Sequence, residues 1–325
     1  MRPHLISAAL VAHAAGPPAS RDLWQGWSLE PAVLVGLAVA AAAYALGARG
    51  LWRAGSAAPS GRQAAAFAAG LAAVTLALAS PLDNLAAALF AAHMAQHMLL
   101  VMVAAPLLVL GAPGLPMSFA LPPHDRRRLG RLRRQPAVAA ARRLLTRPMV
   151  AWAVHVGTLW VWHLPGPYQA ALASDLVHAA EHAGFLGTGV LFWWVVLSRQ
   201  GRRLAPGFAV LYLFAAALQA SALGALLTLA PAPLYPLQAA ASAARGVAPL
   251  ADQQLAGLIM WVPADLIYLS AAGTLFMRWL VSLEHTSPRR QAPDRPAPPA
   301  TSDGRPWRPA SQSPVGHDAG RKGDV

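Results

Sequence analysis

Long apolar segments alternate with short polar ones along most of the chain. The apolar segments cover residues 31–48, 64–79, 85–110, 149–163, 176–197, 205–229 and 255–280. Several of them exceed the roughly 18 residues that indicate a transmembrane helix. The pattern predicts an all-α membrane protein, a bundle of about seven transmembrane helices.

Basic residues gather after every second apolar segment. Nine arginines lie between Arg126 and Arg147, after the third segment, and Arg278 lies at the end of the seventh. The first and fifth segments are followed by Arg49, Arg53, Arg62, Arg199, Arg202 and Arg203. The intervening loops hold only Arg245. Because cytoplasmic loops carry the excess of Lys and Arg, the N-terminus is predicted outside and the C-terminus inside.

The two ends of the chain differ from this membrane domain, which we place at residues 15–284. Residues 1–14 combine Arg2, an apolar run and Ala12-His13-Ala14, a pattern typical of a signal peptide. Residues 285–325 hold eight prolines and seven basic residues, which predicts a disordered cytoplasmic tail. The Arg-rich stretch 125–145 is interpreted as a solvated topology determinant, with a helix on the inner membrane surface as the alternative.

Composition narrows the classes of function. Charged residues make up only 12% of the chain, and the formal net charge is +13. Since the arginines lie between and after the spans, the charge indicates a lipid bilayer as partner and no nucleic acid. The absence of cysteine excludes disulfides and thiolate metal sites. Any metal must be bound by His, Met or carboxylate.

The third apolar segment contains His93 and His97, which are four residues apart and share a helix face. They lie in its outer half, and two imidazoles at this spacing can bind one metal ion. Met94 and Met98 add thioethers beside them, and Met102 continues the stripe. Imidazole with thioether and without thiolate suits copper better than zinc. For the methionines themselves, ordinary packing is the favoured interpretation.

The fifth apolar segment carries a second set, His178, Glu181 and His182, on one helix face. Two histidine pairs at one depth place metal or proton chemistry level with a merely structural role for these histidines. The set also matches H-x-x-E-H, the inverted zinc-peptidase motif, in which the glutamate is the base. That pattern is weakly specific, because it needs a third ligand and a water-accessible cleft.

Four further ionisable residues lie in or near the spans. His155 is expected near mid-membrane, and His163 at the outer end, at the depth of the two pairs. Asp252 lies just outside the seventh apolar segment and Asp265 within it. An intramembrane ionisable residue is a functional hypothesis by default, although Asp265 could equally pair with a histidine across the bundle.

Several motifs together resemble the seven-helix CtaG-type cytochrome c oxidase assembly factor family over about residues 30–280. They are His93-Met94-x-x-His97-Met98-Leu99-Leu100, Pro106-Leu107-Leu108-x-Leu110-Gly111-x-Pro113, Trp162-His163-x-Pro165 with Tyr168, His178-x-x-x-His182 with Phe192-Trp193, and Asp252-Gln253 with Gly257, Trp261 and Pro263. The resemblance implies a non-enzymatic role in assembling haem-copper oxidase in the bacterial plasma membrane. It also implies cytochrome c oxidase subunits as partners.

The working hypothesis is that the two histidine pairs face each other and hold copper transiently in the outer half of the bundle. His163, Asp252 or a methionine would complete the site, with Glu181 and Asp265 as further candidates. Three alternatives stay open: an intramembrane zinc metallopeptidase, a haem or metal transporter with axial histidines, and a purely structural scaffold.

Overall fold

The computed structural model describes residues 26–198 and 204–286, and all regular structure in that part of the chain is helical. The predicted signal segment (residues 1–14) and residues 287–325 of the predicted tail lie outside the described residues. The helices are α2 (Pro31–Arg53), α3 (Gly61–Leu78), α4 (Pro81–Ala88), α5 (Phe90–Met98), the π-helix η2 (Leu99–Ala104), α6 (Ala105–Leu110), α7 (Gly114–Phe119), α8 (Pro123–Arg134), α9 (Pro136–Leu145), α10 (Pro148–Trp162), α11 (Pro165–Ala173), α12 (Asp175–Leu197), α13 (Pro206–Leu229), α14 (Pro236–Ala244) and α15 (Pro249–Thr286). The predicted all-α class is confirmed.

Six helical stretches in the described part are long and apolar enough to cross a membrane. They are Pro31–Arg53, Gly61–Leu78, Phe90–Leu110, Asp175–Leu197, Pro206–Leu229 and Pro249–Leu283. The remaining expected span is α10, which has 15 residues and therefore rises only about 22 Å against a hydrocarbon core of about 30 Å. The chain is a multi-pass membrane protein, while the count of seven spans and their orientation stay predictions.

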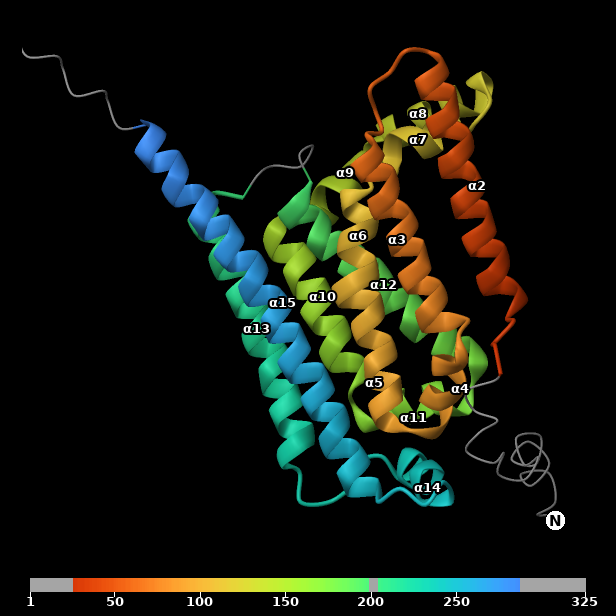
Figure 1. Ribbon diagram of the computed structural model, residues 1–325, viewed down its shortest axis with the longest axis vertical. Helices are drawn as coiled ribbons and strands as arrows, with labels where there is room; N and C mark the ends of the chain where they lie inside the picture. Colours follow the sequence, from red (N-terminus) through yellow and green to blue (C-terminus); the bar gives the residue numbers. More distant parts are fainter. Residues whose placement is uncertain (1–25, 199–203, 287–325) are drawn as a thin grey trace, which may run out of the picture. The chain divides into compact units, whose positions relative to one another are not determined.

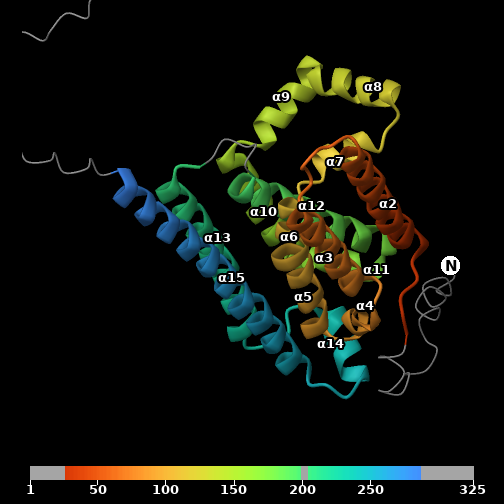
Figure 2. The ribbon, with the colours of Figure 1, turned by 45° about the horizontal axis from the view of Figure 1, so that its top comes forward.

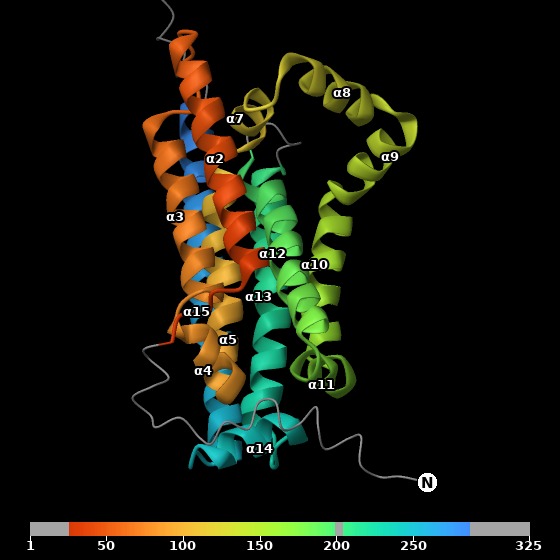
Figure 3. The same ribbon diagram turned by 90° about the vertical axis from the view of Figure 1, so that its right-hand side faces the viewer.

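Three short helices, α4, α11 and α14, lie together at one end of the bundle, and α7, α8 and α9 lie at the other (Figures 1 and 3). The sequence pattern predicts only turns or loops at these three places. Each short helix instead begins with a proline, Pro81, Pro165 or Pro236. Proline suits the first helical turn because its backbone angle is already helical and no N–H is needed there.

The third apolar segment is broken rather than continuous. Leu89 is extended, with φ −126° and ψ 131°, and it separates α4 from α5. The carboxylate of Asp252 accepts hydrogen bonds from the backbone N–H groups of Phe90 (2.7 Å) and Ala91 (3.0 Å). The first N–H groups of a helix have no partner within the helix, so this side chain determines where α5 begins.

The core at the middle of the bundle is formed by η2, α12, α13 and α15. Its larger buried side chains are Val101, Met102, Phe185, Phe192, Trp193, Tyr212, Leu213 and Tyr268. The indole N–H of Trp193 donates to the carbonyl oxygen of Val101 in the π-helix, at 2.9 Å. Large apolar side chains such as Leu211, Leu218 and Leu266 are exposed. An outer surface of this kind fits lipid contact, where helices need no polar face.

The Arg-rich stretch after α7 forms two helices, α8 and α9. No residue of either helix is buried. Figure 2 shows them as an arm beside the bundle, connected to it through α7 and α10. This exposure fits both interpretations of the stretch, a helix at the membrane surface and a solvated topology determinant.

Candidate metal site

The first two turns of α5 carry the histidine pair that the sequence pattern singled out. His93 and His97 are 1% and 2% exposed. Their ring centroids are 4.4 Å apart, with the rings nearly perpendicular. Because Asp252 determines the start of α5, it also determines the depth of both imidazoles.

The start of α12 carries the second set on one face, as predicted. Glu181 is 0% exposed, His182 is buried and His178 is half-buried. The rings of His178 and His182 are 4.2 Å apart. The helix therefore presents two imidazoles and a carboxylate to its neighbour.

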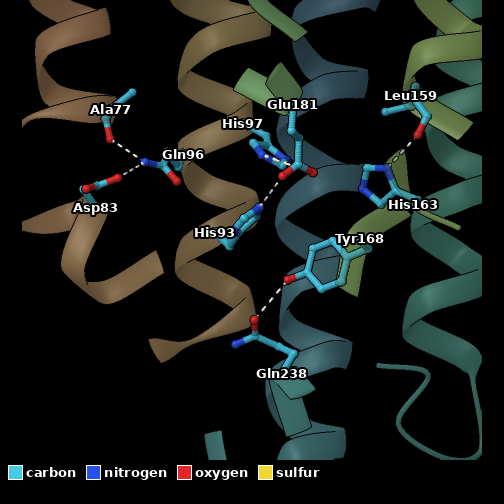
Figure 4. A network of polar contacts seen from close by, with 10 residues as sticks. All are labelled: Ala77, Asp83, His93, Gln96, His97, Leu159, His163, Tyr168, Glu181 and Gln238. Carbon is cyan, nitrogen blue, oxygen red and sulfur yellow. Dashed lines mark hydrogen bonds and ion pairs between the residues drawn. The ribbon is translucent and has the colours of Figure 1, made fainter. Parts of the chain in front are cut away.

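The two sets face each other. The ring of His93 lies 5.5 Å from that of His178 and 6.1 Å from that of His182, and His97 lies 5.3 Å from His182. The carboxylate of Glu181 approaches Nε2 of His93 at 3.7 Å and Nε2 of His97 at 3.9 Å. Figure 4 shows this carboxylate between the α5 histidines on one side and His163 on the other. We call His93, His97, His163, His178, Glu181 and His182 the histidine cluster.

The ligand atoms are close to the spacing that one metal ion requires. Among the described residues, two groups of three have ligand atoms within 4.8 Å of one another: His93, His97 and His182, and His93, His178 and Glu181. Ligands about 2.0 Å from a tetrahedral ion are separated by roughly 3.4 Å. The two Glu181 distances exceed this value by only a few tenths of an ångström, so small side-chain rotations would complete the coordination.

Eight polar atoms of the cluster are buried without hydrogen-bond partners. They are His93 Nε2, His97 Nδ1 and Nε2, His163 Nε2, His178 Nε2, His182 Nε2 and both carboxylate oxygens of Glu181. Burying one unpaired polar group costs about 1–3 kcal/mol, and more when it is charged. A metal ion would give several of these atoms a partner at once, so the residues present fit such an ion.

His163 is oriented as a metal ligand would be. It follows α10, is buried, and its Nδ1–H donates to the carbonyl oxygen of Leu159 at 2.7 Å. A proton on Nδ1 leaves the lone pair on Nε2, and metal-binding histidines are commonly oriented in this way. The hydroxyl of Tyr235 donates to the carbonyl oxygen of His163 at 2.7 Å and fixes the backbone there.

The two methionines expected beside the histidines lie at the border of the cluster. Met94 is completely buried and packs with Phe90 and Tyr168. Met98 is half-buried and lines a small cavity that His97 and His163 also line. Met94 thus has the contacts of a packing residue, as expected. Met98 lies close enough to His97 and His163 to be considered as a thioether ligand.

Asp252 and Asp265, also among the candidates, lie outside both groups of potential ligands. Asp252 accepts three hydrogen bonds, two from backbone N–H groups of α5 and one from the hydroxyl of Ser242 at 2.6 Å. Asp265 accepts a hydrogen bond from the hydroxyl of Ser221 at 2.7 Å, joining α15 to α13. Asp252 is thus occupied by a structural role, and the partner of Asp265 is a serine rather than a histidine.

His155 lies apart from the cluster, with hydroxyl groups beside both ring nitrogens. The hydroxyl of Thr188 donates to the carbonyl oxygen of Gly184 at 2.8 Å and lies 3.2 Å from Nδ1 of His155. The Thr188 oxygen is therefore free to accept the Nδ1–H of His155. The Tyr268 hydroxyl lies 3.4 Å from Nε2, which keeps the lone pair.

Two supports of the site were not predicted from sequence. The amide of Gln96, between the α5 histidines, donates to Asp83 Oδ1 and to the carbonyl oxygen of Ala77, both at 2.8 Å (Figure 4). The hydroxyl of Tyr168 donates to Gln238 Oε1 at 3.0 Å, and its ring contacts that of His93 at 5.4 Å. Burial raises the pKa of the Tyr168 phenol, which stays a donor. A glutamine inside an apolar span was the available signal for the first of these.

The haem alternative lacks room beside the cluster. The cavity that touches His97 and His163 has a volume of about 20 Å³, whereas sites for small molecules and cofactors occupy roughly 300–1,000 Å³. A larger cavity of about 1200 Å³ lies between α2, α3, α6 and α12 and is lined by no histidine. Axial haem ligation by the paired histidines is therefore not favoured.

The fold and the site define an all-helical, multi-pass membrane protein with imidazoles and one carboxylate buried together among its spans. The family model of the cytochrome c oxidase caa3 assembly factor (Caa3_CtaG) matches residues 42–282, and the chain belongs to this family. The resemblance noted in the sequence is confirmed. Comparisons with curated proteins and with solved structures returned no match.

Proposed function

We propose that this member of the oxidase assembly family handles copper, which the histidine cluster holds transiently before it enters the oxidase. The observation that carries the proposal is the set of six imidazole nitrogens and two carboxylate oxygens that are buried together without hydrogen-bond partners. Copper is preferred over zinc because the chain offers no cysteine and places thioethers beside the imidazoles.

The residues of the cluster would have different roles in binding the ion. His93, His97 and His182 supply three neutral nitrogen ligands, and the Glu181 carboxylate offsets the charge of the ion. His178, which is half-buried, lies where an ion enters or leaves. More candidate ligands than one ion needs allow ligands to exchange, and a transfer site requires that the ion can leave.

The cluster is proposed to lie toward the outer face of the bacterial plasma membrane. It lies at the end of the bundle that carries α4, α11 and α14, whereas the Arg-rich α8 and α9 lie at the opposite end (Figure 3). The excess of positive charge marks the cytoplasmic side. Copper would then reach the cluster from the outside, where cytochrome c oxidase subunits are the expected partners.

We infer a role in assembly without catalytic turnover. The metallopeptidase alternative requires Glu181 to act as a base on water in an open cleft. Glu181 is 0% exposed, and its carboxylate is directed at the two α5 histidines. Membership in an assembly factor family does not favour proteolysis either.

The assembly role is tested in a bacterial strain that lacks this chain. We expect membranes of that strain to lose haem-copper oxidase activity and its reduced-minus-oxidised haem spectrum, and we expect added copper to restore both. Loss without rescue by copper would contradict copper delivery but retain the assembly role. An unchanged oxidase would contradict the assembly role itself.

The metal site is tested by complementing that strain and by titrating the purified protein with copper. His93→Ala/His97→Ala should bind copper at least tenfold more weakly and fail to restore the oxidase. The matched control is His124→Ala, because His124 is exposed on α8 and, among the described residues, pairs only with the neighbouring Asp125. Equal copper affinity in wild type and the double variant would contradict the proposal.

A further inference from the structure

A small cavity lies next to the histidine cluster, deeper in the bundle. Its volume is about 20 Å³, enough for a single water molecule and therefore for one ion without its hydration shell. Helices α5, α10, α12, α13 and α15 and the π-helix η2 contribute to its wall. The cavity is thus at the centre of the bundle and not at a lipid-facing surface.

Methionine is the commonest residue in the wall of this cavity. Four of the eight methionines of the chain line the cavity, namely Met94, Met98, Met102 and Met260. Met94, Met102 and Met260 are 0%, 6% and 1% exposed. Methionine is flexible and fills core gaps well, yet here four thioether side chains surround a space that they leave open.

Three imidazoles also line the cavity. His97 and His163 belong to the histidine cluster, and His155, which lies outside the cluster, lines the cavity together with Tyr268. Nε2 of His155 keeps its lone pair and has only the long 3.4 Å contact with the Tyr268 hydroxyl. The wall therefore offers soft sulfur ligands together with a nitrogen ligand that can be detached from its present partner.

The backbone at this level is also irregular. Met102 lies in the π-helix η2, which interrupts the α-helical span. Single π-helical turns are rare and frequently occur at functional sites. The indole N–H of Trp193 donates to the carbonyl oxygen of Val101 and so stabilises the π-helical turn that carries Met102.

We propose that this cavity is a second metal site, selective for a soft monovalent ion such as Cu(I), in which Met98, Met102, Met260 and His155 are the ligands. The ion passes from the histidine cluster by exchange of ligands beside His97, which is a ligand in the cluster and also lines the cavity. It stays Cu(I) throughout, so no electron donor or acceptor is involved. That the physiological ion is copper rests on the proposed function, whereas the preference for soft ions follows from the thioethers.

The test measures how many Ag(I) and Zn(II) ions the purified full-length protein binds, since Ag(I) is a soft ion like Cu(I). Wild type should bind one more Ag(I) than Zn(II). Met98→Leu/Met102→Leu/Met260→Leu should lose one Ag(I) and keep the Zn(II). These substitutions conserve volume and are well tolerated in cores, and retained Zn(II) binding reports that the variant is folded.

The matched control is Met117→Leu/Met149→Leu/Met277→Leu, which changes three methionines that do not line the cavity and should bind both ions as wild type does. His178→Ala/His182→Ala should lose the Zn(II) and one Ag(I) but keep the sulfur-bound Ag(I). If the His178→Ala/His182→Ala variant still binds Zn(II), the histidine cluster is not the Zn(II) site. The proposal for the cavity then depends on the Ag(I) binding of the methionine variant alone.

X-ray absorption of wild type loaded with Cu(I) tests the ligands without any substitution. We expect sulfur neighbours in addition to nitrogen when both sites are filled. Nitrogen and oxygen neighbours alone would overturn the proposal. Full Ag(I) binding by the cavity variant would also overturn it and leave the methionines as packing residues.

Discussion

Two carboxylates are buried near the same end of the bundle, and their surroundings are opposite. Asp252 is 4% exposed and accepts hydrogen bonds from Phe90 N–H, Ala91 N–H and the Ser242 hydroxyl. Glu181 is 0% exposed and has no hydrogen-bond donor beside either oxygen. Its nearest polar neighbours are the imidazoles of His93 and His97.

The difference separates a residue that builds the site from one that belongs to it. A buried charge is tolerated when it is paired or bound to a metal. Asp252 meets this condition with groups of the fold itself, and it holds the start of α5 in place. Glu181 has no hydrogen-bond partner of this kind in the fold, and a bound metal ion would supply a partner for its charge.

The largest effect is expected from Asp252→Ala, because it leaves the N–H groups of Phe90 and Ala91 buried without an acceptor, whereas the Ser242 hydroxyl can still donate to the carbonyl oxygen of Gln238 at 3.0 Å. We expect the free energy of unfolding to fall by about 3 kcal/mol, measured by denaturant unfolding in detergent. Asp125→Ala is the control, since Asp125 is half-exposed on α8 and pairs only with His124 in the part of the chain that the structure describes. This substitution should cost under about 0.5 kcal/mol. A loss below about 1 kcal/mol for Asp252→Ala would contradict the structural role.

Copper should stabilise the folded protein through the histidine cluster. A free ion concentration of one hundred times the dissociation constant raises the free energy of unfolding by about 2.7 kcal/mol. This is measured as a rise in the melting temperature. His178→Ala/His182→Ala should reduce the rise to the part that the methionine-lined cavity contributes, and His124→Ala should retain it in full. An equal rise in all three proteins would mean that copper binds elsewhere.

Glu181→Gln should differ from Asp252→Ala in that it weakens copper binding and leaves the stability of the metal-free protein nearly unchanged. It removes a buried charge that has no donor, so the metal-free protein should keep its stability within about 1 kcal/mol. Copper affinity, measured by competition with a chromophoric chelator, should fall roughly 10- to 100-fold. Destabilisation as strong as that of Asp252→Ala would place Glu181 among the structural residues.

The smallest effect is expected from Tyr168→Phe, which removes the hydroxyl that donates to Gln238 but keeps the ring against His93. The loss should be about 1 kcal/mol, with copper affinity unchanged, as measured by the same unfolding and competition assays. A tenfold fall in affinity would assign Tyr168 to the metal site.

The part of the site that lies within one helix was predictable from sequence. Spacing of four residues puts His93 beside His97 and His178 beside His182, since α-helical geometry is local. The missed elements are those decided by distant contacts. The break at Leu89 depends on Asp252, which is more than 150 positions away in the chain, and no local pattern reports it.

The choice among the acidic candidates was likewise beyond the sequence. Glu181, Asp252 and Asp265 are all costly charges in or near apolar spans. The sequence indicates each of them equally as a possible support of one metal site. The fold brings Glu181 to the α5 histidines, gives Asp252 three donors and gives Asp265 a serine. The distinction lies in the partners, which come from other helices.

The sequence by itself determined the helical membrane class, the positions of most spans, the family and the two histidine pairs. All of these follow from hydrophobicity, helical periodicity and residue type, which act along the chain. Only the tertiary structure decided that the pairs converge, that one carboxylate joins them without hydrogen-bond donors and that methionines surround the adjoining cavity. Those facts depend on how the helices pack, because packing determines which side chains from different helices meet and which polar atoms are left without a partner.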